Sequence, residues 1–196
     1  MAKLYLRLAL VGGLVVAAAV AAGCGGGSPA RTRVPAASPV EFETTSEAFA
    51  PGGEIPPVHT CDGENSSPPL SWPEPPPRAL SFAVIMDDPD APGGAFTHWL
   101  LYNLLNWTRD VPEALEKVKQ PASGGFQGVN DFGDIGYGGP CPPPGESHRY
   151  RFTVYAVARL INLQPGASKE ELQSAMAGQI LGQAELVGTY ARPAGP

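Results

Sequence analysis

The sequence predicts a mainly β protein, an antiparallel β-sandwich with one or two peripheral helices. Three apolar segments of strand length are separated by long loops, and 24 glycines and 23 prolines are spread through the 196 residues. Helix signals are confined to two short segments. Many strands joined by loops of this composition are typical of two sheets packed face to face.

The strand predictions rest on composition and on alternation. Residues 80–86 form a largely apolar run flanked by prolines and aspartates, which predicts a buried central strand. Residues 96–104 are apolar on both faces, and residues 149–157 place Tyr150, Phe152 and their alternating neighbours on one face. Residues 41–44 and 186–191 are weaker strand candidates near the ends of the domain.

Two segments have helical signals. Ser168 and Glu171 form a capping box, and apolar residues follow at helical spacing as far as Ile180, so a helix is expected there. Residues 111–118 are a second, weaker candidate, with Pro112 in the expected first turn.

Residues 1–23 have the pattern of a lipoprotein signal peptide. Lys3 and Arg7 precede an apolar run over residues 8–22 that is short for a membrane span, and small residues lead to Cys24. This ending resembles the bacterial lipobox, so we expect Cys24 to be lipidated; an ordinary signal peptide with a chance cysteine is the alternative. Both predict export.

The remaining chain divides into a tether and one domain. Residues 24–40 are rich in Gly, Ser, Pro and Ala, which predicts a flexible tether. Residues 41–193 have the length of one domain with one core. The predicted location is therefore the outer, extracytoplasmic face of a bacterial cell membrane, held there by the lipid.

The net charge limits the classes of partner, and the cysteine content indicates a disulfide. The net charge of −6 argues against nucleic acid and against electrostatic adsorption to anionic lipid. With Cys24 assigned to the lipid, Cys61 and Cys141 remain as a pair in an oxidising compartment, which favours a disulfide. Two unpaired thiols are the alternative.

The candidate site begins where a loop rich in proline and glycine, residues 138–145, meets a predicted strand. His148 and Tyr150 share a face of that strand, whereas Arg149 points to the other side. Two polar side chains beneath a stiff rim predict a small polar pocket. Loop amides could add hydrogen-bond donors for an anion.

A second polar group follows the predicted central strand. Prolines flank Asp90 and limit its backbone freedom, and Asp88 directly precedes that turn. Aspartates in turns usually bond the local backbone. The return strand, however, would bring His98 to the same end of the sheet as Asp88, where the carboxylate could orient a histidine.

No pattern in the sequence predicts catalysis. There is no Gly-x-Ser-x-Gly motif, and Ser147 faces away from His148 on an extended strand. His59, His98 and His148 are scattered and form no recognised zinc motif. We therefore expect a protein that is not an enzyme and that has no metal or cofactor.

Four motifs occur in one order along the chain: Asp88-Pro89-Asp90-Ala91-Pro92, Thr97-His98-Trp99-Leu100, Gly138-Gly139-Pro140 and His148-Arg149-Tyr150. Over about residues 49–190 they resemble the phosphatidylethanolamine-binding protein family, in its bacterial Raf-kinase-inhibitor-like branch. The resemblance implies a conical pocket for phosphate-like anions and phospholipid headgroups. It implies one wall of Asp88, Asp90 and His98, a rim of Pro140 and Pro142, and an opposite wall of His148 and Tyr150.

The expected function is that of a membrane-tethered, non-enzymatic binding protein for phosphate-bearing ligands or phospholipid headgroups. If the histidines hold the anion, its affinity should fall as pH rises through their pKa values. The alternative is a modulator or inhibitor of an envelope protease, for which the glycine-rich residues 121–134 would be the projecting loop. Homodimer formation is also left open.

Overall fold

The computed structural model describes residues 39–194. The elements are β1 (Val40–Glu41), a 3-10 turn (Pro57–His59), β2 (Leu70–Ser71), β3 (Ser81–Asp88), β4 (Phe96–Leu105), β5 (Asp110–Val111), β6 (Phe126–Gln127), β7 (Ser147–Val157), α1 (Lys169–Met176) and β8 (Ile180–Ala191). The predicted mainly β fold is confirmed.

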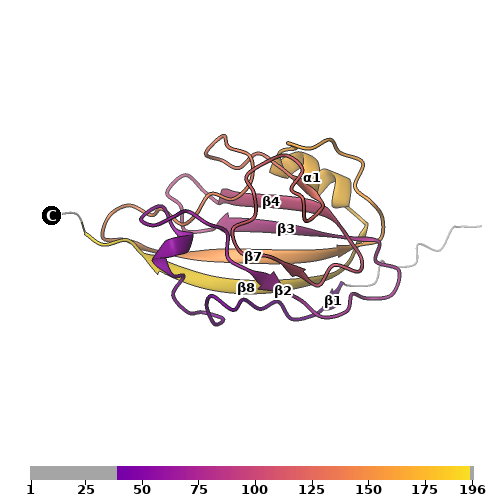
Figure 1. The fold of residues 1–196 in the computed structure, drawn as a ribbon, viewed down its shortest axis with the longest axis horizontal. Coiled ribbons are helices and arrows are strands. Elements are labelled where there is room, and N and C mark those ends of the chain that lie inside the picture. Colours follow the sequence, from indigo (N-terminus) through magenta and orange to yellow (C-terminus); the bar gives the residue numbers. More distant parts are fainter. Residues whose placement is uncertain (1–38, 195–196) are drawn as a thin grey trace, which may run out of the picture. The chain divides into compact units, whose positions relative to one another are not determined.

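The strands form one large sheet and one small sheet (Figure 1). The six-stranded sheet has the order β1-β8-β7-β3-β4-β6, and β2 pairs with β5 in the other sheet. Every pair of neighbours is antiparallel except β1 and β8, which run parallel, so the large sheet is mixed.

The central strand β3 is buried along its whole length, as the apolar run predicted. Its alternate side chains enter two different cores. Phe82, Val84 and Met86 pack into the core that includes β2 and β5, whereas Ala83 and Ile85 pack into the core that includes α1. Side chains two apart in a strand share a face, so β3 separates the two cores.

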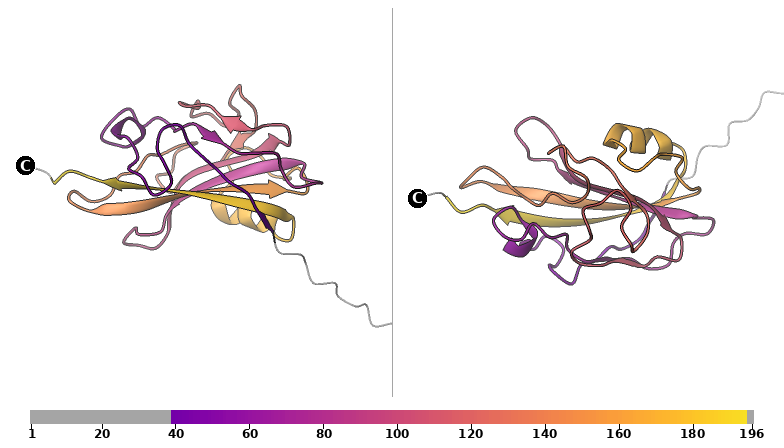
Figure 2. Two further views of the ribbon diagram at one scale, coloured as in Figure 1. Left: turned by 90° about the horizontal axis from the view of Figure 1, so that it is seen from below. Right: turned by 45° about the horizontal axis from the view of Figure 1, so that its top comes forward.

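The two cores make the large sheet the middle layer. Figure 2 shows α1 on one side of this sheet and the segments around β2 on the other. Strand β7 contributes its predicted apolar face, with Tyr150, Phe152 and Val154 in the core on the β2 side. Its other face is more accessible, and Arg149 on it is exposed.

Helix α1 begins at its predicted capping box. The Ser168 hydroxyl accepts a hydrogen bond from the Glu171 amide, and the Glu171 carboxylate accepts one from the Ser168 amide. The helix ends at Met176, earlier than predicted. Gly178 adopts a φ of 70°, which favours glycine, and Ile180 already belongs to β8.

The predicted helix over residues 111–118 is wrong. Val111 pairs with Leu70 in the small sheet, and Ala114 has a φ of 56°, which a helix does not allow. The amides of Ala114 and Leu115 donate instead to the backbone oxygen and the hydroxyl of Ser67, both over 2.9 Å. Tertiary hydrogen bonds have replaced the helical ones.

The two weak strand candidates differ from their predictions in length. The N-terminal strand is confined to Val40–Glu41 rather than residues 41–44, and β8 starts at Ile180, well before residue 186. Sheet pairing with β7 from Val157 to Ser147 sets the length of β8. Its two glycines therefore lie within a strand that local propensity alone would not predict.

The predicted signal peptide, Cys24 and all of the predicted tether except Pro39 and Val40 lie outside the described residues. Val40 already pairs with Gly182, so β1 begins inside the range predicted for the tether. Between residues 39 and 194, no helix has the length and apolar character needed to cross a bilayer.

The large sheet has two ends with different contents. At one end β3 finishes, β4 and β7 begin and β8 finishes, with Asp88 beside Phe96 and Ser147 beside Ala191. We call this the pocket end, because the predicted site residues cluster there. The opposite end holds β1 and the start of β8, and we call it the distal end.

Candidate functional site

A cavity of about 300 Å³ opens at the pocket end of the large sheet. Its walls come from the end of β3 and the turn after it, the start of β4, the rim loop and the start of β7. Its lining residues are Asp88, Ala91, Pro92, Phe96, His98, Phe132, Cys141, Pro142, Pro143, His148 and Arg192.

A larger hollow of about 460 Å³ adjoins this cavity, and Phe132 and Cys141 line both. We place the candidate site in the smaller cavity. It brings together two buried histidines and a buried aspartate from three strands, whereas the charged residues of the larger hollow, Lys117 and Asp134, are exposed. Convergent titratable groups in a concavity indicate a binding site better than volume does.

Asp88 and His148 form the central contact of the cavity. The Asp88 carboxylate lies 2.7 Å from His148 Nδ1 through Oδ2, and both side chains are buried. The other carboxylate oxygen accepts a hydrogen bond from the Asp90 amide over 2.8 Å. Asp88 therefore orients a histidine, as the sequence suggested, but the histidine is His148 rather than its strand neighbour His98.

His148 contacts a second carboxylate. Its Nε2 atom lies 3.3 Å from the exposed carboxylate of Glu146. Burial would lower the pKa of His148, but the hydrogen bonds to Asp88 and Glu146 outweigh burial and raise it above the usual value of 6.5. Two carboxylates, one on each ring nitrogen, favour the doubly protonated imidazolium.

His98 has the opposite character. Its Nδ1 lies 2.6 Å from the Gly138 carbonyl oxygen, which can only accept, so Nδ1 carries a proton. Burial lowers the pKa of His98, and the hydrogen bond to Gly138 only partly opposes this effect. At neutral pH the ring is uncharged, and its Nε2 is a hydrogen-bond acceptor with no partner among the described residues.

Tyr150 lies against His98 but does not line the cavity. The two rings are 5.2 Å apart and nearly perpendicular, and the tyrosine is completely buried. Its hydroxyl is one of two buried side-chain polar atoms in residues 39–194 without a hydrogen-bond partner. Burial, reinforced by the negative charge of Asp88, raises the pKa of Tyr150 well above its usual value.

Asp90, the other expected wall residue, has a different contact. Its carboxylate accepts three hydrogen bonds from Arg149, two from the guanidinium and one from the backbone amide. These hydrogen bonds lower the pKa of Asp90 far below its usual value. Because Arg149 lies on the outward face of β7, this ion pair braces the turn from outside the cavity.

The rim combines prolines with a disulfide. Pro142 lines the cavity, whereas Pro140 is buried and its carbonyl accepts a hydrogen bond from the Cys61 amide over 3.0 Å. The structure forms the disulfide expected between Cys61 and Cys141, with sulfur atoms 2.04 Å apart. The bond fixes the rim loop to the segment that follows the 3-10 turn.

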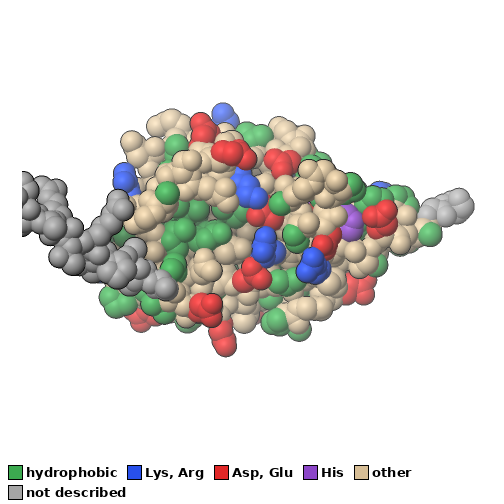
Figure 3. All heavy atoms as spheres, turned by 180° about the vertical axis from the view of Figure 1, so that it is seen from behind, with side chains coloured by type: hydrophobic (Ala, Val, Ile, Leu, Met, Phe, Trp, Pro, Cys, Tyr) green, Lys and Arg blue, Asp and Glu red, His purple; other side chains and the backbone are tan. Residues whose placement is uncertain are grey.

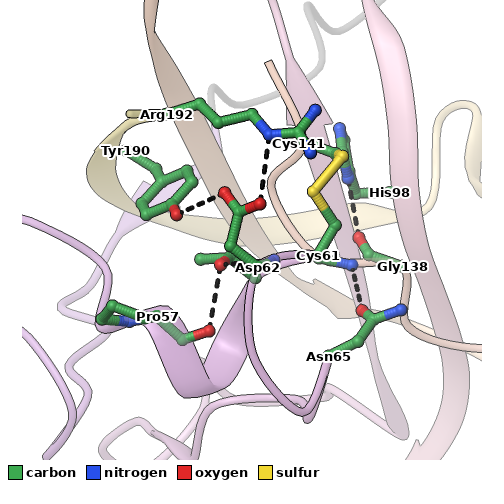
Figure 4. The surroundings of a disulfide bond; sticks show 11 residues. Pro57, Cys61, Asp62, Asn65, His98, Gly138, Cys141, Tyr190 and Arg192 are labelled. Atoms are coloured by element: carbon green, nitrogen blue, oxygen red, sulfur yellow. Dashed lines mark hydrogen bonds and ion pairs between the residues drawn. A yellow bond between two sulfur atoms is a disulfide. The ribbon is translucent and has the colours of Figure 1, made fainter. Parts of the chain in front are cut away.

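The same segment positions a cation at the cavity. Asp62, next to the disulfide, accepts hydrogen bonds from the Tyr190 hydroxyl over 2.7 Å and from Arg192 Nε over 3.1 Å (Figure 4). Arg192 lines the cavity and also exchanges backbone hydrogen bonds with residues 145 and 146. The C-terminal end of β8, the rim loop and the disulfide thus meet at one place.

Sequence reasoning missed three contributors to the site: Arg192, Glu146 and Phe132. Arg192 follows β8, and Phe132 is far from every motif; only tertiary contacts bring them to the cavity. The two-residue spacing of Glu146 and His148 was a usable signal, because such neighbours share a face in a strand or in an extended entry to one.

The glycine-rich segment 121–134, the expected projecting loop, is held against the domain. β6 lies within it and pairs with β4 at Leu101 and Tyr102. The Gln127 side chain is buried, accepts a hydrogen bond from the Trp99 indole and donates to the carbonyls of Glu116 and Val118. An envelope protease as partner therefore stays a prediction without support from this segment.

Comparisons with known proteins agree on one family. The family model described as "Phosphatidylethanolamine-binding protein" matches residues 45–191. The UPF0098 protein of Aquifex aeolicus is 49% identical over 153 residues, covering 77% of this chain and 89% of the relative. A Mycobacterium tuberculosis relative named as a candidate lipoprotein, LppC, is 37% identical over 185 residues, covering 86% and 88%.

A solved structure extends this agreement to the fold. Escherichia coli YbcL, described as a member of the mammalian PEBP family, superposes with a TM-score of 0.71 at 33% identity. The match covers 78% of this chain and 99% of YbcL.

The Asp88–His148 contact predicts a pH-dependent stability. Because folding raises the pKa of His148, the contribution is complete below the unfolded pKa of about 6.5 and is lost as pH rises through the folded pKa. We expect the difference in unfolding free energy between wild type and His148→Gln to shrink between pH 5.5 and pH 9. Urea denaturation at several pH values measures it, and a constant difference would contradict the expectation.

The disulfide predicts a large loss of stability on removal. It closes a loop with a sequence separation of 80 residues. The chain-entropy relation gives about 4.5 kcal/mol for a loop of this size, so the Cys61→Ser/Cys141→Ser variant should be less stable by that order. Urea denaturation under oxidising conditions measures the loss. Reduced wild type is the matched control, and it should resemble the double variant.

Proposed function

The chain belongs to the phosphatidylethanolamine-binding protein family, and on that basis we propose that it binds phosphate-bearing small molecules or phospholipid headgroups in the cavity beside Asp88, His98 and His148. We further propose that it does so without catalysis, as a lipid-anchored protein on the outer face of a bacterial membrane. The observation that carries the proposal is the set of polar atoms that converge on one small cavity with complementary donor and acceptor roles.

The donors and acceptors suit a phosphate group that retains one proton. His148 and Arg192 supply positive donors for the charged oxygens. His98 Nε2 can accept a hydrogen bond from a P–O–H group, because its Nδ1 proton is committed to Gly138. The buried Tyr150 hydroxyl, which has no partner, is a further donor if the floor of the cavity adjusts to the ligand.

Asp88 does not contradict an anion site. A free carboxylate would repel phosphate, but both oxygens of Asp88 are already engaged, one by His148 and the other by the Asp90 amide. The negative charge of Asp88 therefore stabilises the imidazolium of His148, and the positively charged Nε2–H group of that ring faces the ligand. Glu146 occupies that Nε2 position, and an incoming phosphate would replace its carboxylate there.

The location rests on the sequence and on one relative. Cys24 follows a segment with signal-peptide character, and the name of the Mycobacterium tuberculosis relative describes a lipoprotein. We propose the absence of catalysis because the polar groups of the cavity pair with one another or with the backbone in a way that suits ligand binding. Ser147, the hydroxyl next to His148 in sequence, is exposed on the other face of β7.

Titration calorimetry with inorganic phosphate, phosphoethanolamine and a short-chain phosphatidylethanolamine tests the proposal and separates free phosphate from headgroup binding. His148→Ala should weaken phosphate-group binding roughly 10- to 100-fold, because it removes a charge-assisted hydrogen bond of about 1.5–3 kcal/mol. Affinity should fall as pH rises through the raised pKa of His148. Arg151→Gln is the matched control: its guanidinium pairs with the exposed Glu185 and does not line the cavity, so binding should change less than twofold. Absence of binding by all three ligands would overturn the proposal.

Glu146 provides a test with the opposite sign. Its carboxylate is exposed and competes for His148 Nε2, so Glu146→Gln should tighten phosphate binding about two- to fivefold at pH 6, where His148 keeps its proton. Glu185→Gln is the control. Glu185 is exposed to a similar degree, but it pairs with Arg151, and neither residue lines the cavity. Equal effects of the two variants would contradict a direct role for Glu146.

A further inference from the structure

Apolar side chains are exposed at the distal end of the large sheet. Trp107 is 70% exposed, and Leu80, Leu105 and Leu160 are between 37% and 53% exposed. We call these four residues the distal patch. Figure 3 shows hydrophobic side chains gathered on the half of one face that lies away from the visible histidine.

Three of the four residues of the distal patch share one groove. Leu105, Trp107 and Leu160 line one groove of about 280 Å³ together with Phe126. Leu80 does not line this groove, but it precedes Ser81, which pairs with Leu105 at the same end of the sheet. Contiguous exposed apolar surface of this kind marks a site of interaction with a protein or a membrane.

The chain enters the domain at this same end. Val40, itself more than half exposed, pairs with Gly182 near the start of β8. The start of β8 is also where Ile180 pairs with Val157, and Val157 pairs with Ser81 beside Leu80. The predicted tether from Cys24 therefore joins the domain at the same end of the sheet as the distal patch and at the opposite end from the cavity.

Lengths favour contact between the distal patch and the bilayer. β8 spans 12 residues from the distal end to the pocket end, which corresponds to about 40 Å. A tether of the predicted composition over residues 25–39 has an average end-to-end distance of roughly 20 Å. A lipid on Cys24 therefore keeps the distal end near the bilayer, and the cavity reaches the same bilayer only if the tether is strongly stretched.

The charges of the distal end permit this contact. Its segments carry Arg78, Arg109 and Arg159 together with Glu41, Glu74 and Asp110, so they are neutral within a chain of net charge −6. Neutral surface is not repelled by lipid headgroups, and tryptophan is the side chain that favours the membrane–water interface. Contact would rest on apolar burial, so zwitterionic lipid should suffice.

We propose that the distal patch docks on the phospholipid bilayer to which Cys24 is anchored, with the cavity opening away from that bilayer. The proposal rests on the lipid anchor of the proposed function and deepens it. A phosphate-bearing ligand then reaches the cavity from the aqueous side, not from the leaflet that holds the anchor.

Trp107 is a built-in probe of this docking. The chain has three tryptophans, and Trp72 and Trp99 are buried, so Trp107 alone faces outward in residues 39–194. The full lipidated chain is reconstituted into phosphatidylcholine vesicles with brominated acyl chains. We expect quenching and a blue shift of the Trp107 emission, protection from aqueous iodide, and loss of the quenched component in Trp107→Phe.

Two charge variants locate the contact. Leu160→Glu should stay on the vesicles through its lipid but lose the bromine quenching of Trp107, because a carboxylate resists burial in the interface. Phe132→Glu is the matched control at the pocket end, with an exposed fraction of 48% against 53% for Leu160, and it should leave the quenching unchanged. Leu160→Glu should also leave phosphate affinity unchanged, since Leu160 is remote from the cavity.

The outcomes separate this proposal from the proposed function. Vesicles that carry the chain while Trp107 stays accessible to iodide would overturn docking and leave phosphate binding intact. A chain that does not float with vesicles would overturn the anchor and the docking together. Protection of Trp107 without vesicles, at concentrations where sedimentation shows a dimer, would assign the patch to a second copy of the chain and overturn docking.

Discussion

The burial of β3 on both faces is the constraint on which the rest of the structure depends. A strand that is apolar on both sides must be covered on both sides, which places α1 over one face of the sheet and the segments around β2 over the other. It also fixes where polar residues can occur. Asp88 is the last residue of β3, and it is tolerated in a buried position because two hydrogen bonds satisfy its carboxylate at the edge of the core.

A buried carboxylate would repel an anionic ligand, and hydrogen bonding of Asp88 to His148 and to the Asp90 amide removes this conflict in the cavity. Asp88 holds His148 in its charged form. His98 is hydrogen-bonded to a carbonyl oxygen rather than to a carboxylate, and its buried ring stays neutral. Two histidines in one site therefore take opposite roles, one as donor and the other as acceptor. The environment of each ring, rather than the residue type, makes this distinction.

The proposals assign ligand binding to the pocket end of the large sheet and membrane docking to the distal end. Cross-links concentrate at the pocket end, where the disulfide, the Asp62 contacts and the Asp90–Arg149 ion pair hold the rim, the C-terminal end of β8 and the turn after β3. Such preorganisation favours binding, because less of the binding free energy is then lost in ordering the site. The distal end is held instead by side-chain hydrogen bonds to the backbone, from Trp72, Ser81 and Asn106, and it exposes the four apolar residues of the distal patch.

Local patterns were enough to determine the mainly β fold, the buried central strand, the capping box of α1 and the shared face of His148 and Tyr150, because each depends on neighbours two to four residues apart. The motifs also grouped Asp88, His98 and His148, which line one cavity in the structure. Only the tertiary structure decided that Asp88 pairs with His148, that Asp90 turns outward to Arg149, and that Arg192 and Phe132 complete the walls. It likewise replaced the predicted helix over residues 111–118 by hydrogen bonds to Ser67. These outcomes depend on partners tens of residues away, whose positions are set by sheet register and core packing, and a local pattern contains no information about either.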